Sequence, residues 1–208
     1  MSVQGVVAAI TGQHIVAIVR AREAAAAGET VRRLLGAGLR AVEVSLVTPD
    51  ALRVIEELAG QTQAGAYLGA GTVMNAQQAR ACADAGAAFL VAPTLRADVI
   101  EMGHDRGLAV LPGACTPTEM TAALDAGADL VKLFPAGQWS PASVCDLRAS
   151  LPGLPLVPTG GVTPETAAAW LQAGCVAVGM GSALTVGRPE DLAPQVTRLL
   201  ASLQEAAR

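Results

Sequence analysis

Lysine is almost absent from this chain of 208 residues. Of its 14 basic residues only Lys132 is a lysine, and every other one is arginine. Aromatic residues make up 2% of the sequence, the net charge is −4, and the arginines are scattered without forming a cluster. Proteins that bind nucleic acids usually carry a basic patch, so we expect no nucleic-acid partner.

Long apolar segments and cysteine motifs are also missing. No apolar stretch approaches about 18 residues without Gly, Pro or charge, so we expect no membrane partner. The start, "MSVQGVVAAITGQH", lacks a basic segment before an apolar core, and we interpret it as a short amphipathic helix. The absence of a CxxC pair favours reduced, mostly buried thiols, a cytoplasmic location and no metal site for Cys82, Cys115, Cys145 and Cys175.

Eight short runs rich in Val, Ile and Leu alternate with Ala-rich stretches of helical period. The runs are "HIVAIVR" (14–20), "RAVEVSL" (40–46), "AYLGAGT" (66–72), "AAFLVAP" (87–93), "LAVLPGA" (108–114), "DLVKLFP" (129–135), "LPLVPTGG" (154–161) and "CVAVGMGS" (175–182). Eight uninterrupted strand–helix units fit a (β/α)8 TIM barrel better than a doubly wound sheet. Because the sequence contains no linker or low-complexity segment, we expect one domain over residues 1–208, ending in a helix near 189–206.

Several of the helical stretches carry recognisable ends. Some begin with Thr-Pro or Ser-Pro, an N-cap followed by proline at the first helical position. Others end in glycine, as at Gly38, Gly86 and Gly127. Because the chemistry of a (β/α)8 barrel lies at the C-terminal ends of its strands, polar residues within or just after the strands are the first candidates.

Lys132 lies in the apolar run "DLVKLFP". Side chains alternate along a strand, so Leu130, Lys132 and Phe134 should point into the barrel while Val131 and Leu133 point outward. An interior lysine is unfavourable unless it is neutral or paired, so it is a salt-bridged or rim-reaching residue, or it is an amine nucleophile. Arginine cannot take the second role, because its guanidinium stays protonated. A neutral lysine forms a Schiff base with a carbonyl carbon, and the iminium accepts electrons when an adjacent C–C bond breaks.

Glu43 stands between two valines in the run "RAVEVSL". Alternation turns Ala41, Glu43 and Ser45 inward. Burial should raise the pKa of Glu43 towards neutrality, which suits a general acid or base. An ion pair with Lys132 or an arginine is the alternative, and the two interpretations are compatible.

Glycines follow the last two predicted strands, in "PTGGVTPE" and "GMGSAL". Backbone N–H groups there can approach a phosphate, although tight turns alone would also explain these glycines. The glycines of "GAGT" could likewise let Thr72 meet the substrate. Arg20, at the end of the first strand, is an anion clamp or a partner in a salt bridge at the rim.

With these residues in view, the chain resembles the bacterial aldolases that act on 2-keto-3-deoxy-6-phosphogluconate (KDPG) and 4-hydroxy-2-oxoglutarate (KHG). The matching blocks run in order along nearly the whole chain: "IVAIVR", "GLRAVEVSLVTPDA", "GAGTVMNAQQ", "GAAFLVAPTL", "LPGACTPTEMTAAL", "LVKLFPA", "PTGGV" and "AVGMGSAL". The resemblance implies a (β/α)8 barrel, a homotrimer, a small 2-keto acid substrate, and Schiff-base chemistry that needs no metal or other cofactor.

The resemblance also implies roles for individual residues. The family's Schiff-base lysine falls on Lys132 and its base on Glu43. Its threonines, taken to contact the pyruvate-derived part and the substrate hydroxyls, fall on Thr72 and Thr159. The other residues expected to bind substrate are Arg20, Pro93, Phe134, Gly160, Gly161, Gly181 and Ser182.

Two positions depart from the family pattern. Many members have arginine where this chain has Val47, and Arg20 is expected to supply the missing charge. The block "GMGSAL" replaces the commoner "GGSWL", which alters the phosphate pocket. Thr159 resembles the enzymes for the gluconate substrate, since relatives for the galactonate substrate tend to lack threonine there.

The expected reaction is cleavage of KDPG to pyruvate and glyceraldehyde 3-phosphate. Cleavage of 4-hydroxy-2-oxoglutarate to pyruvate and glyoxylate is expected as a second activity. The alternatives are an aldolase for the galactonate epimer, an isomerase, epimerase or synthase in which Lys132 only neutralises charge, and a phosphosugar-binding barrel without activity.

Overall fold

The computed structural model describes residues 2–185 and 191–208. All strand pairs within these residues are parallel. Each of the eight runs predicted as strands contains at least one strand. The strands are β1 (Ile15–Val19), β2 (Ala41–Ser45), β3 (Tyr67–Gly71), β4 (Phe89–Val91), β5 (Ala109–Leu111), β6 (Gly113–Ala114), β7 (Val131–Leu133), β8 (Leu156–Pro158) and β9 (Val178–Met180).

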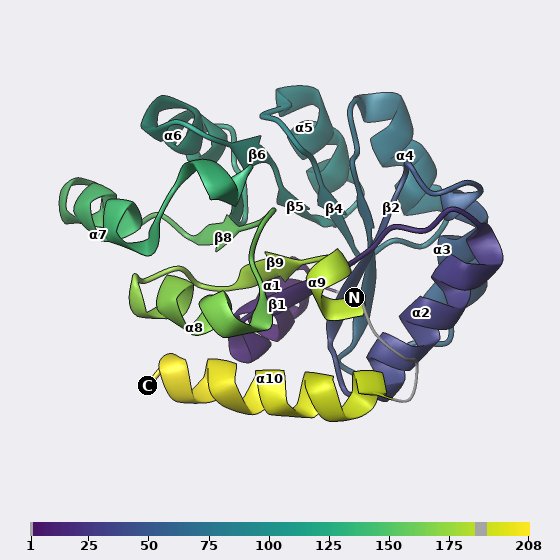
Figure 1. The fold of residues 1–208 in the computed structure, drawn as a ribbon. Helices are drawn as coiled ribbons and strands as arrows, with labels where there is room; N and C mark the ends of the chain where they lie inside the picture. Colours follow the sequence, from purple (N-terminus) through teal and green to yellow (C-terminus); the bar gives the residue numbers. More distant parts are fainter. Residues whose placement is uncertain (1, 186–190) are drawn as a thin grey trace.

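The strands form two sheets. Six strands pair in the order β5-β4-β3-β2-β1-β9 and three in the order β6-β7-β8, so the fold is an α/β fold with a curled parallel sheet (Figure 1). The structure differs from the predicted single eight-stranded barrel at Pro112, which separates β5 from β6. Proline has no N–H to donate to a strand ladder, and the predicted fifth strand is therefore divided. The outer edges of the two sheets meet at an isolated bridge between Thr159 and Gly179.

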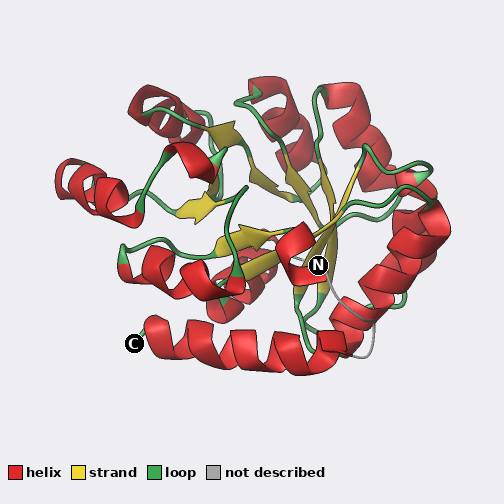
Figure 2. Ribbon diagram, in the orientation of Figure 1, coloured by secondary structure: helices red, strands yellow, loops and turns green. Residues whose placement is uncertain are grey.

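Helices follow nearly every strand and lie outside the sheets (Figure 2). They are α1 (Val3–Gln13), α2 (Ala24–Gly36), α3 (Ala51–Ala59), α4 (Ala76–Asp84), α5 (Ala97–Asp105), α6 (Pro117–Asp125), the 3-10 helix η1 (Ala136–Gln138), α7 (Pro141–Ser150), α8 (Pro164–Gln172), α9 (Ser182–Thr185) and α10 (Leu192–Ala206). The predicted last helix is confirmed from Leu192, and its residues 189 and 190 lie outside the described residues. Within the described ranges, no helix has both the length and the hydropathy to span a bilayer.

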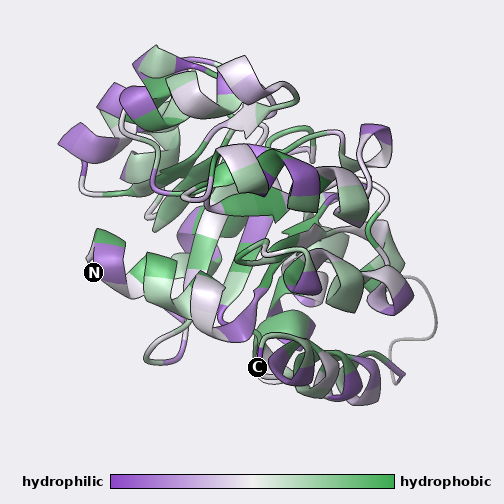
Figure 3. Ribbon diagram, turned by 90° about the vertical axis from the view of Figure 1, so that its left-hand side faces the viewer, coloured by the Kyte–Doolittle hydropathy of each residue, from purple (hydrophilic) through white to green (hydrophobic). Residues whose placement is uncertain are grey.

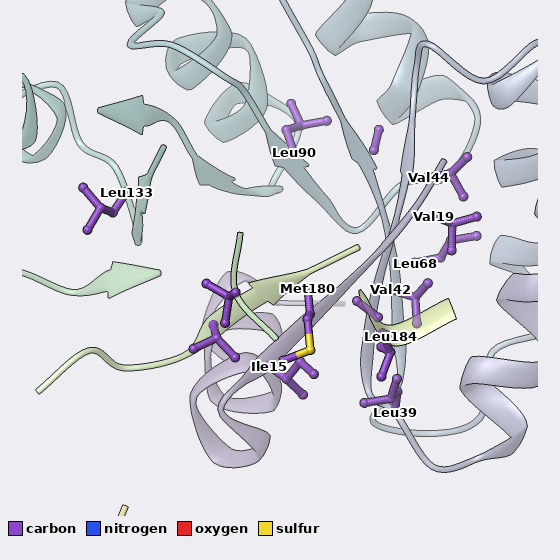
Figure 4. Close-up of a cluster of buried hydrophobic side chains, with 14 of the residues drawn as sticks. Ile15, Val19, Leu39, Val42, Val44, Leu68, Leu90, Leu133, Met180 and Leu184 are labelled. Carbon is purple, nitrogen blue, oxygen red and sulfur yellow. The ribbon is translucent and has the colours of Figure 1, made fainter. Parts of the chain in front are cut away.

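Buried apolar side chains form two clusters, one on each face of the strands. The cluster between strands and helices contains Val42, Val44, Val131 and Leu133, as Figure 4 shows for three of them. The cluster enclosed by the strands contains Ala41 and Leu130 together with Val6, Ile10, Phe89 and Leu111. The alternation predicted for the second and sixth runs is therefore confirmed. In Figure 3 the hydrophilic segments lie mainly on the outer helices.

Helix α1 closes the enclosed cluster at one end. Val6 and Ile10 of this helix are buried against the inward side chains of the strands. Since α1 leads directly into the start of β1, it covers the N-terminal ends of the strands. The polar residues that point inward therefore lie towards the C-terminal ends of the strands.

Three of the predicted proline helix starts are confirmed, with N-caps Thr116, Ser140 and Thr163. The Thr-Pro pair at Thr48 behaves differently, because α3 begins at Ala51. The buried Thr48 hydroxyl instead accepts a hydrogen bond from the Ala21 backbone N–H at 3.2 Å. This threonine therefore joins the loops that follow β1 and β2.

The capping box of α6 gives a stability prediction. The Thr116 hydroxyl accepts from the Glu119 N–H, and the Glu119 carboxylate accepts from the Thr116 N–H at 2.9 Å. We expect Thr116→Ala to lower the free energy of unfolding by about 1 kcal/mol, measured by urea denaturation. The matched control is Thr118→Ala on the same helix, because the exposed Thr118 side chain forms no hydrogen bond among residues 2–185 and 191–208. Equal stability of the two variants would contradict the prediction.

Candidate active site

A pocket that is partly open to solvent is lined by residues of both sheets. Three polar side chains reach it: Glu43 from β2, Lys132 from β7 and Thr159 just after β8. The remaining lining residues are apolar or glycine: Val16, Ile18, Val91, Leu111, Val157 and Gly179. The structure therefore brings together the two residues predicted to be catalytic and one predicted substrate-binding threonine.

Lys132 lies in this pocket with only 7% of its surface exposed. Its backbone N–H donates to the Pro112 carbonyl at 2.9 Å, which ties β7 to the residue between β5 and β6. Its Nζ atom is 4.9 Å from the centre of the Phe134 ring, within the range of a cation–π contact. Lys132 forms no salt bridge with any residue in the described part of the chain, so the alternative of a salt-bridged lysine is not found.

Glu43 is 2% exposed, and a glycine makes the space for its carboxyl group. A Cβ atom added at Gly71, at the end of β3, would overlap that carboxyl group. Glycine within a strand often marks such a close approach. The glycines of "GAGT" were predicted to let Thr72 meet the substrate, and the space that Gly71 leaves for Glu43 was not predicted.

The pKa of Glu43 is raised, as its burial predicts. Burial in the pocket is the main cause, and the charges of Lys132 and Arg20 oppose it to a smaller extent. Across the described residues Glu43 has no ion-pair partner, so the ion-pair alternative is not found here either. The site thus holds the Lys132 amine and, in the same mainly apolar pocket, the Glu43 carboxyl group, whose pKa is raised.

The raised pKa of Glu43 predicts a pH-dependent difference in stability. A folded chain that binds this proton more tightly than the unfolded chain loses stability as the pH rises from 4.5 through the raised pKa. Glutamine cannot ionise, so Glu43→Gln avoids that loss. We expect the free energy of unfolding of Glu43→Gln, relative to that of the parent, to increase as the pH rises through this range. Below this range the pH-dependent increase should be absent.

Urea denaturation at a series of pH values measures this difference. The matched control is Glu101→Gln, which removes the same charge from an exposed position on α5. The prediction would be contradicted if the free energy of unfolding of Glu43→Gln, minus that of the parent, were independent of pH or decreased as the pH rises.

Thr159 is 5% exposed, and its hydroxyl donates to the Val157 carbonyl at 3.1 Å. A Cβ atom at Gly179 would overlap the Thr159 side chain, so Gly179 admits this threonine to the pocket. Gly160 and Gly161 follow with φ of 90° and 87°, which only glycine adopts readily. These residues turn the chain from β8 towards α8.

The other predicted substrate-binding residues surround the same end of the strands. Gly160 lies against the Phe134 ring, and Gly181 lies beside Ile18. Ser182 is exposed at the start of α9, directly after Gly181. Pro93 follows β4 and is half-buried, and its carbonyl lies close against Gly113 of β6.

Arg20 follows β1 and is exposed. It forms no salt bridge or hydrogen bond through its side chain among residues 2–185 and 191–208, so the predicted alternative of a rim salt bridge is not found. Its charge nevertheless acts on Glu43. Val47, after β2, is 57% exposed and supplies no charge. A cation available to an anionic ligand is therefore present at Arg20 and absent at Val47.

The cysteines differ in part from the prediction. All four are free thiols, but only Cys82 and Cys175 are buried, while Cys145 is exposed. Burial raises the pKa of Cys82 and that of Cys175 to about 12, which keeps both protonated and unreactive. In the described part of the chain, no group of three or more His, Cys, Asp or Glu side chains is placed to hold a metal ion.

Comparison with known proteins identifies a family. Residues 6–196 match the family described as "KDPG and KHG aldolase". A 2-dehydro-3-deoxy-6-phosphogalactonate aldolase of Escherichia coli is 37% identical over 74% of this chain and 76% of its own length. A 2-dehydro-3-deoxy-phosphogluconate aldolase of Zymomonas mobilis is 33% identical over 84% of this chain and 81% of its own.

A solved structure gives the same result. The structure described as "Native KDPGal structure" superimposes with a TM-score of 0.85 and 34% sequence identity, over 92% of this chain and 95% of that one. The protein is therefore an aldolase, a carbon–carbon lyase. It belongs to the KDPG and KHG aldolase family.

Proposed function

We propose that this protein is a class I aldolase in which Lys132 forms a Schiff base with the ketone of a 2-keto acid. The observation that carries the proposal is the Lys132 amine, 7% exposed and without a salt bridge in the described residues, in one pocket with Glu43. A neutral amine at this position can attack the carbonyl carbon of a ketone, which a guanidinium cannot do. The two sheets, joined at Pro112 and at the Thr159–Gly179 bridge, would together make the (β/α)8 barrel of the family.

In the proposed mechanism the neutral Lys132 amine attacks C2, and loss of water with uptake of one proton, which the final hydrolysis releases again, gives the iminium. Glu43, directly or through a water molecule, accepts the proton of the C4 hydroxyl. The C3–C4 bond then breaks, its electron pair moves towards the iminium, and the aldehyde leaves. Glu43 returns the proton to C3 of the enamine, and hydrolysis of the iminium releases pyruvate and restores the amine.

The proposed substrate is KDPG, which gives pyruvate and glyceraldehyde 3-phosphate. The Thr159 hydroxyl in the pocket supports the gluconate configuration, in line with the pattern of the family. The galactonate epimer is the second candidate, because the Escherichia coli relative and the superimposed structure carry names for it. A smaller substrate, 4-hydroxy-2-oxoglutarate, would give pyruvate and glyoxylate at the same two catalytic residues.

The two ends of the substrate would bind at different parts of the pocket mouth. Arg20 is the cation for the carboxylate, and the glycine loops after β8 and β9 would bind the phosphate through their N–H groups. These loops contribute Gly160, Gly161, Gly181 and Ser182.

We also expect a homotrimer in the cytoplasm, as the resemblance and the free thiols suggest.

Relative kcat/KM values for KDPG, its galactonate epimer and 4-hydroxy-2-oxoglutarate test the proposal, with pyruvate release as the signal. We expect the highest value for KDPG. A preference for the galactonate epimer would replace the substrate assignment and leave the aldolase mechanism intact. Lack of cleavage of all three compounds would overturn the proposed function. The Lys132→Met variant, purified in the same way and assayed with the same compounds, controls for a contaminating aldolase.

A further inference from the structure

A buried hydroxyl pair lies where β2 and β3 end. The Ser45 side chain, at the end of β2, is fully buried, and its Oγ is 2.7 Å from Oγ1 of Thr72, just after β3. Ser45 is the next inward residue after Glu43 on the same strand, about 6.6 Å further towards the open end. The pair therefore lies one step above the catalytic carboxyl group.

The direction of this hydrogen bond follows from burial. Within the described residues, Thr72 Oγ1 is the only partner of the Ser45 hydroxyl. The geometry allows either hydroxyl to donate. A buried hydroxyl needs an acceptor for its proton, which favours Ser45 as the donor and Thr72 as the acceptor. Because Thr72 is only half-buried, its own proton is then free to face away from Ser45.

The backbone of Thr72 adopts an unusual conformation. Its φ is 63°, a left-handed conformation that is strained for a β-branched residue. The neighbouring residues hold it there: the Val73 N–H donates to the Val91 carbonyl at 3.1 Å, and the Leu46 N–H donates to the Gly71 carbonyl at 2.8 Å. Strain of this kind persists where the surrounding structure fixes a group in a required position.

We propose that Ser45 is a positioning residue, which holds the Thr72 hydroxyl with its proton directed at a carboxylate oxygen of the bound 2-keto acid. This inference rests on the proposed function, because it assumes that a 2-keto acid occupies the pocket. Ser45 itself touches no substrate. Its contribution is to keep the Thr72 hydroxyl oriented as a hydrogen-bond donor. An anionic oxygen needs a donor, and a freely rotating hydroxyl would point its proton there only part of the time.

Borohydride trapping at increasing pyruvate concentration tests the inference. In Ser45→Ala we expect the half-saturating pyruvate concentration to rise about tenfold, since one aligned hydrogen bond is lost, while trapping at saturation stays complete. Ser45→Thr keeps the hydroxyl and should restore the value to within about threefold of the parent. Ser45→Ala should add nothing further in a Thr72→Val background, because Ser45 acts through the Thr72 hydroxyl.

An unchanged half-saturating concentration in Ser45→Ala would overturn the inference. So would additive effects in the double variant, or a failure of Ser45→Thr to restore binding. If Ser45→Ala does not fold, as judged by thermal unfolding, the Ser45→Thr and Thr72→Val arms decide alone: Ser45→Thr must bind like the parent, and Thr72→Val must bind more weakly. Absence of trapping in the parent protein would instead contradict the proposed function, so the two failures are distinct.

Discussion

Replacing Lys132 by arginine should reduce kcat for aldol cleavage by roughly 10⁴-fold or more. Arginine keeps the positive charge and much of the length, but its guanidinium stays protonated and cannot attack a ketone. Steady-state assay of pyruvate release from KDPG at saturating substrate measures the loss. The same variant should give no covalent product with pyruvate and borohydride.

Lys132→Met is the matched control for folding. It fills a similar volume in a pocket whose other walls are mainly apolar, so we expect it to unfold at or above the temperature of the parent. Both variants should be equally inactive. Substantial activity in Lys132→Arg, with Lys132→Met inactive, would mean that the residue acts only as a charge. The alternative of a barrel enzyme without a Schiff base would then be favoured.

Glu43→Gln should lower kcat by roughly 10²- to 10⁴-fold while leaving Lys132 reactive. Glutamine fits the space against Gly71 but cannot accept the C4 hydroxyl proton or return a proton to C3. Borohydride should therefore still trap pyruvate on this variant after longer incubation. A loss of turnover combined with retained trapping separates proton transfer from Schiff-base formation.

Two further variants control the Glu43 experiment. Glu43→Asp keeps an acid but shortens it, so we expect intermediate activity. Glu101→Gln removes the same charge from an exposed helix position and should leave kcat unchanged. Full activity in Glu43→Gln would contradict the assignment of Glu43 as acid and base, whatever the result at Lys132.

Much of the fold follows from local patterns in the sequence. Each run of Val, Ile and Leu contains a strand, because a parallel sheet covered on both faces needs apolar residues on both. Inward and outward faces could be assigned for β2 and β7 since side chains alternate strictly along a strand. The division at Pro112 is also visible in the sequence, in the missing N–H, but which neighbour each half pairs with depends on tertiary structure.

The candidate site was predictable where a residue type conflicts with its surroundings. Lys132 and Glu43 stand out as charges within apolar strands, and the structure brings both into one pocket. The Ser45–Thr72 pair was missed as a pair, because a hydrogen bond between residues 27 positions apart leaves no local signal. Gly71 and Gly179 were missed as space for side chains, although glycine within a strand is a recognisable hint.

The most direct test of the Schiff-base assignment is mass spectrometry of the parent protein after borohydride reduction with pyruvate. No other lysine side chain competes, so peptide mapping has to distinguish Lys132 only from the α-amino group of the chain. We predict one reduced pyruvate adduct, located at Lys132 by peptide mapping and absent from Lys132→Arg. A chain left unmodified at Lys132 under conditions where the enzyme is active would contradict the Schiff-base mechanism.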